Sequence, residues 1–126
     1  MIVRCKRMNY VEYGKENSNV IILLHGGGLS WWNYRAVAKM LQYEYRVILP
    51  ILDGHAASDR DFTTIEDNAA EVIEFINEQF GGSVLLLGGL SLGVRFCLKS
   101  YLSVRIFVSS HSLRVRLSYR QNSCIL

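Results

Sequence analysis

The stretch Gly89-Leu90-Ser91-Leu92-Gly93 follows the apolar run 84–87 and precedes a segment whose apolar residues have helical spacing. A serine hydroxyl becomes a useful nucleophile when a sharp turn between a strand and a helix lifts it out of a packed sheet. Such a turn leaves no room for side chains two residues before and after the serine, and glycine stands at both positions here. The spacing therefore predicts a nucleophile elbow with Ser91 at its tip.

Two further motifs stand upstream of this elbow. His25-Gly26-Gly27-Gly28 follows the apolar run 20–24, and Asp53-Gly54-His55-Ala56-Ala57-Ser58 follows the expected strand that begins at Arg46. Together the three motifs resemble the α/β-hydrolase family, and the resemblance covers about residues 11 to 109. The last motif is similar to the family's D-x-x-G-H-G-x-S segment, with Ala56 in place of one glycine.

The resemblance implies a serine hydrolase that acts on an ester or a related acyl substrate. In that interpretation Ser91 is the nucleophile. The backbone N–H groups of Gly27, Gly28 and Leu92 form an oxyanion hole for the negative charge that develops on the substrate.

The chain's three histidines all fall in loops at the carboxyl edge of the expected sheet, where ligands bind in parallel α/β folds. A general base must lie within about 3 Å of the serine that it activates. In the resembled family the histidines that match His25 and His55 hold loops by hydrogen bonds, and His111 comes too early in the chain to match the family's base. The sequence identifies no base for Ser91 by resemblance, and a catalytic role for one of the three stays open.

Charge is distributed unevenly along the 126 residues. The first 78 residues hold eight basic and eleven acidic residues, a net charge of −3, whereas the last 48 hold six basic residues and no acidic one, a net charge of +6. The family order is serine, then acid, then histidine, and no acid follows Ser91. A complete fold of this kind is a single domain of about 200 to 250 residues. We therefore expect the N-terminal part of a hydrolase domain at 1–109 and an atypical basic tail at 110–126.

Two hypotheses follow from the absence of the family's acid and base. In the first, the chain is a serine hydrolase whose acid and base are missing from it. In the second, it is a catalytically inactive fragment of a truncated or frame-shifted gene, with a tail that departs from the family from about Ser103, and it is at most a ligand-binding remnant.

The predicted fold class is α/β, with an incomplete, mostly parallel sheet and flanking helices. We expect one or two edge strands within 2–13, further strands at 20–24, 46–51, 83–88 and 104–109, and a helix at 92–102. A helix at 31–43 is expected to bury Trp32, Ala36, Val37, Met40 and Leu41. Another helix begins at a capping box on Thr63 or Thr64 and ends at Gly81-Gly82. Alternating residues 113–119 favour an antiparallel strand at the C-terminal edge.

Other kinds of function find little support in the sequence. The spacing Gly88 to Gly93 is not followed by the lysine of a P-loop, and no G-x-G-x-x-G is present, so we expect no nucleotide cofactor. The three cysteines stand singly, which argues against a metal site and favours reduced thiols in the cytoplasm. No apolar run is long enough to span a membrane, and a net charge of +3 is a weak basis for nucleic-acid binding. The expected partner is a small acyl substrate, and no partner chain is identified.

Overall fold

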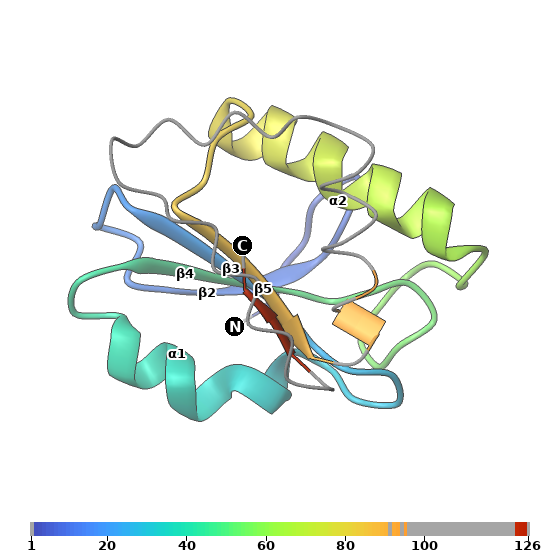
Figure 1. Ribbon diagram of the computed structural model, residues 1–126, viewed down its shortest axis with the longest axis horizontal. Helices are drawn as coiled ribbons and strands as arrows, with labels where there is room; N and C mark the ends of the chain where they lie inside the picture. The colour runs from blue at the N-terminus through green and yellow to red at the C-terminus, as the bar shows by residue number, and fades with distance from the viewer. Residues whose placement is uncertain (1, 91, 94, 96–122, 126) are drawn as a thin grey trace.

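The protein, seen in a computed structural model, is described over residues 2–90, 92–93, 95 and 123–125. Its centre is a six-stranded sheet in the order β1-β2-β4-β3-β5-β6. Helices α1 and α2 lie on opposite faces of this sheet (Figure 1). Each face has its own apolar core, because the residues of successive strand positions point to opposite sides.

The strands are β1 (Ile2–Val3), β2 (Tyr10–Tyr13), β3 (Val20–Leu24), β4 (Arg46–Pro50), β5 (Leu86–Leu90) and β6 (Ser123–Ile125). Strands β1, β3, β4 and β5 run in one direction, and β2 and β6 run in the other. All five residues of β3 are buried, as expected for a strand covered on both faces. The predicted α/β class, with a partial and mostly parallel sheet, is confirmed.

Helix α2 (Ile65–Phe80) begins and ends where the sequence predicts. The hydroxyl oxygen of Thr64 accepts a hydrogen bond from the backbone N–H of Asp67 at 3.0 Å. Gly81 closes the helix in the left-handed region, with φ of 65°. The helix buries Val72 and Phe75, and the ring of Phe75 packs edge-on against Tyr10 of β2.

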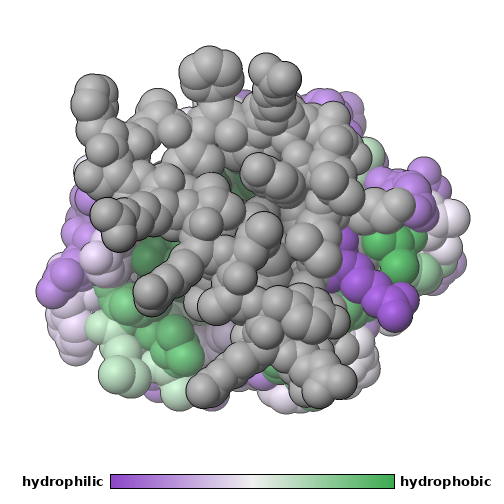
Figure 2. Space-filling model, in the orientation of Figure 1, coloured by the Kyte–Doolittle hydropathy of each residue, from purple (hydrophilic) through white to green (hydrophobic). Residues whose placement is uncertain are grey.

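The helix predicted at 31–43 is shorter, and its buried face is a different one. It consists of the 3-10 helix η1 (Trp31–Tyr34) and of α1 (Arg35–Leu41). The residues that meet the sheet are Trp31, Tyr34, Ala38 and Leu41. Of the residues expected to be buried, Trp32, Ala36, Val37 and Met40 are exposed, Met40 to 78%. Hydrophobic surface is accordingly visible over α1 in Figure 2. Both faces of this segment carry apolar residues at helical spacing, so the face predicted from that spacing was the wrong one.

The end of β5 also differs from the prediction. The strand was expected at 83–88 but runs from Leu86 to Leu90, because β3 offers it a parallel partner as far as Gly89. An antiparallel strand does stand at the C-terminal side of the sheet, but it is β6 and it pairs with β5. The predicted strands 104–109 and 113–119 lie outside the described residues, as does the boundary drawn at 109. Leu92, Gly93 and Arg95 are helical, and the rest of the helix predicted at 92–102 is not described.

In the described part of the chain, no helix has both the length and the apolarity needed to cross a bilayer.

Candidate functional site

The two glycines that flank Ser91 stand where the backbone allows no side chain. A Cβ atom added to Gly89 would lie 2.5 Å from the carbonyl carbon of Gly93. A Cβ atom added to Gly93 would lie 2.3 Å from the backbone oxygen of Leu24, at the end of β3. The chain therefore folds back tightly between positions 89 and 93 and rests against β3. Ser91 itself lies outside the described residues, so its predicted role as a nucleophile stays a prediction.

The glycine loop lies beside the residue that follows Ser91. A Cβ atom on Gly27 would be 3.8 Å from the side chain of Leu92, an ordinary van der Waals contact. Gly28 has φ of +73°, which favours glycine. Both loop residues are exposed, and their N–H groups donate to no atom of the described residues. The structure thus brings Gly27 and Leu92 together, and the oxyanion hole predicted from Gly27, Gly28 and Leu92 remains a prediction.

His25 connects the ends of two neighbouring strands. Its Nε2 accepts a hydrogen bond from the backbone N–H of Leu52 at 3.1 Å, so the ring proton sits on Nδ1. Nδ1 donates to the carbonyl oxygen of Gly26 at 2.9 Å. The side chain is fully buried, and burial lowers the pKa of His25 to about 4. Both ring nitrogens are therefore occupied in a neutral imidazole, which agrees with the loop-holding role that the resemblance implies.

His55 packs against His25 and also holds a loop. The two rings meet edge to face with centroids 4.9 Å apart. The Nδ1 atom of His55 lies 2.9 Å from the carbonyl oxygen of Asp53, within the loop 53–60. This contact likewise agrees with a structural role. His111 lies outside the described residues, so its role stays a prediction.

Ser30 connects two loops through a hydrogen bond that the sequence did not predict. It is buried, and its hydroxyl donates to the carbonyl oxygen of Ala56 at 2.8 Å. A serine in front of a helix usually indicates an N-cap, but Ser30 makes no side-chain capping bond to η1. It joins the glycine loop to the loop 53–60 instead, so the two loops are fixed to each other by Ser30 and by the His25–His55 contact.

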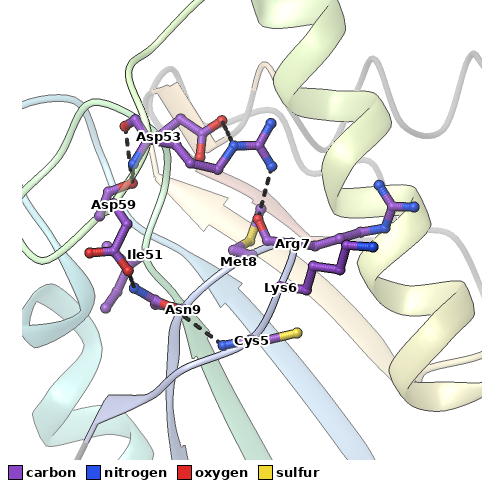
Figure 3. A pocket seen from close by; sticks show the side chains of 10 residues that line it. Cys5, Lys6, Arg7, Met8, Asn9, Ile51, Asp53 and Asp59 are labelled. Atoms are coloured by element: carbon purple, nitrogen blue, oxygen red, sulfur yellow. Dashed lines mark hydrogen bonds and ion pairs between the residues drawn. The ribbon is translucent and has the colours of Figure 1, made fainter.

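A pocket of about 90 Å³, partly open to solvent, lies between the N-terminal segment and the loop 53–60 (Figure 3). Its walls come from residues 5–9, from Ile51 and Asp53, and from residues 58–60. Asp53 is buried, which raises the pKa of its carboxyl group, and Arg60 at 3.7 Å opposes that shift. Arg60 and Arg7 both contact the same carboxylate oxygen of Glu71, at 3.2 and 3.3 Å. These ion pairs fasten the N-terminal segment and the loop to α2.

The described residues contain no group of three or more histidine, cysteine, aspartate or glutamate side chains that could hold a metal ion.

Comparisons with known proteins agree in the kind of fold that they indicate. Residues 21–124 match the model of a family described as the alpha/beta hydrolase family. Among curated proteins, epoxide hydrolase 2 of Caenorhabditis elegans is 26% identical over 72 residues, which are 57% of this chain and 20% of that protein.

Two solved structures illustrate the likeness. An esterase from Thermogutta terrifontis superimposes with a TM-score of 0.71 and 25% identity, over 80% of this chain and 38% of its own. An E-2-(acetamidomethylene)succinate hydrolase superimposes with a TM-score of 0.75 and 21% identity, over 86% of this chain and 41% of its own. The chain thus spans well under half the length of these relatives.

Proposed function

Because this chain belongs to the alpha/beta hydrolase family, we propose that it is a serine hydrolase for ester or related acyl substrates, with Ser91 as the nucleophile. The backbone N–H groups of Gly27, Gly28 and Leu92 then hold the negative charge of the tetrahedral intermediate. The observation that supports this assignment best is the pair of glycines at 89 and 93, each of which has backbone where a side chain would be.

The position of the glycine loop supports the oxyanion hole. Gly27 and Gly28 are exposed, and their N–H groups donate to no atom of the described residues. A Cβ atom built on Gly27 would lie 3.8 Å from the side chain of Leu92, the residue after position 91, so the loop runs close to that residue. An oxyanion hole needs donors about 2.7–3.1 Å from the oxygen that gains charge, and backbone N–H groups from two adjacent segments meet that need without a side chain.

The chemistry of serine favours acyl substrates over the epoxide substrates that the name of the Caenorhabditis elegans relative indicates. When a serine oxygen attacks an acyl carbon, it forms an ester that water can hydrolyse, which releases the acid and returns the serine. When it attacks an epoxide carbon, it forms an alkyl ether, which water does not cleave under mild conditions. A serine at position 91 can therefore complete a catalytic cycle on an ester or a related acyl compound, but not on an epoxide.

The base and the acid of the family have no counterpart that the sequence identifies in this chain. No aspartate or glutamate follows Ser91, and both ring nitrogens of His25 are already bonded. Without a base from His55 or His111, the serine proton passes to solvent, and catalysis comes from binding and the oxyanion hole, which alone give about 10³- to 10⁴-fold acceleration over water. The absence of acidic residues after Glu78 favours the second candidate, an inactive fragment that at most binds a ligand where a hydrolase would bind its substrate.

Labelling with a fluorophosphonate distinguishes the two candidates. In this reaction the serine oxygen bonds to phosphorus, fluoride leaves, and the hydroxyl proton passes to solvent. We expect the full chain to gain one adduct at Ser91, and Ser91→Ala to gain none. Ser83→Ala changes an exposed serine at the other end of the same segment and serves as the matched control. Absence of labelling in folded wild-type chain, or labelling that persists in Ser91→Ala, would contradict the proposal.

A further inference from the structure

The outer edge of β5 is covered by the last residues of the chain. Strand β6 runs antiparallel to β5, and the register places Ile125 opposite Gly88, Cys124 opposite Gly89 and Ser123 opposite Leu90. On its other edge β5 pairs with β3, from Leu86 as far as Gly89. The two ladders therefore end at different points along β5.

Leu90 pairs with β6 but lies beyond the end of the ladder with β3. It is the residue directly before Ser91, and within the described ladders its partner is Ser123 of β6, since the ladder with β3 stops one residue earlier. After the turn, Gly93 rests against Leu24 of β3. Before position 91 the chain thus pairs with the C-terminal strand through Leu90, and after it the chain packs against β3 through Gly93.

We propose that the β5 edge is a β-strand docking site that the chain's own C-terminal strand fills, and that this docking positions the backbone that carries Ser91. The first half concerns the fold alone, and the second half rests on the proposed function. The edge of β5 binds an extended, uncharged segment through main-chain hydrogen bonds, as in β-strand addition to an open sheet edge.

The docked strand is short enough to be exchangeable. It spans three residues, so few backbone hydrogen bonds hold it, and each contributes little net stability. A long intervening segment, residues 91–122, separates β6 from β5, so its return also costs loop-closure entropy. The terminal sequence Gln121-Asn122-Ser123-Cys124-Ile125-Leu126 carries no charged side chain, which suits it to a sheet edge.

Hydrogen exchange of the β5 backbone tests the docking site. Because N–H groups of neighbouring strand residues point alternately to the two sides, proline at both 123 and 124 removes a donor to β5 whatever the local pattern. We expect Ser123→Pro/Cys124→Pro to lose protection of the N–H groups of residues 88–90 that face β6, with those that face β3 still protected, and Ser123→Ala/Cys124→Ala to keep both. Added to the full-length double-proline chain, a synthetic peptide of residues 121–126 should restore the protection, and the same peptide with the two prolines should not. Equal protection of β5 in all of these samples would overturn the proposal.

Fluorophosphonate labelling of the same variants tests the positioning of Ser91. We expect labelling to slow about tenfold or more in the double-proline chain, as for a reacting group misplaced by a fraction of an ångström, and to recover when the peptide of residues 121–126 binds that chain. Loss of protection with labelling at the wild-type rate would overturn the positioning role. If the wild-type chain is not labelled at all, the proposed function fails, and hydrogen exchange still decides the docking site.

Discussion

The neutral, buried His25 predicts a loss of stability in mildly acidic solution. To become charged inside the fold, its Nε2 would have to give up the hydrogen bond from Leu52 and carry a proton without access to water. In the unfolded chain the ring takes up a proton near its ordinary pKa of 6.5, whereas in the fold the pKa is lowered to about 4. Stability from this residue is therefore complete above about pH 6.5 and falls as the pH decreases toward about 4.

The size of the effect follows from the two pKa values. The full difference corresponds to about 3 kcal/mol, and about 2 kcal/mol of it is lost between about pH 7 and about pH 5. Other shifted carboxyl groups matter less in that window. The pKa of Asp53 is raised by burial, so its protonation acts in the opposite direction, and the pKa values of Asp59 and Glu71 are lowered, so they act in more acidic solution.

Urea unfolding over this pH range measures the effect in the wild-type chain and in two variants. His25→Gln keeps an oxygen at about the reach of Nε2 but does not titrate, so its free energy of unfolding should change by less than about 0.5 kcal/mol between about pH 7 and about pH 5. His55→Gln removes the half-buried neighbour and should keep the wild-type slope. The reasoning is refuted if His25→Gln loses as much stability on acidification as the wild type does.

Two backbone predictions accompany this one. Gly93→Ala should lower the free energy of unfolding by more than about 3 kcal/mol, because its Cβ meets the backbone of Leu24, whereas Gly27→Ala should cost less than about 1 kcal/mol; equal costs in thermal unfolding would contradict the close packing. Ala57→Gly should raise stability by about 1 kcal/mol, since Ala57 has φ of 70°, and Ala56→Gly should lower it; a lower melting temperature for Ala57→Gly would show that no strain is relieved.

The sequence predicted those elements whose local signals agree with the fold. Strand β3 reads as five consecutive apolar residues and is buried throughout, and α2 carries its N-cap at Thr64 and its terminal glycine at Gly81. In each case the signal is local, so no knowledge of distant partners is needed. The same holds for Gly89, whose Cβ would meet Gly93 within the turn, whereas the space at Gly93 is limited by Leu24 of the distant strand β3.

Predictions failed where a distant partner decides the outcome. The sequence does not show which face of α1 packs against the sheet. Ala38 and Met40 each belong to a set of apolar residues at helical spacing, but Ala38 is buried and Met40 is exposed. The end of β5 at Leu90 depends on ladders with β3 and β6, which no pattern within residues 83–90 encodes. The bond from Ser30 to Ala56 joins two loops 26 residues apart, and a serine before a helix gives no sign of it.

The contact between Gly93 and Leu24 also constrains the order in which this protein folds. The two residues lie about 70 positions apart, so the turn cannot acquire its final shape from local chain alone, and contacts of such long range form slowly. During synthesis, β3 leaves the ribosome long before its partner does. The close packing of this turn on β3 can therefore form only after both segments have been synthesised, and a nascent chain halted before residue 93 lacks the contact with Leu24.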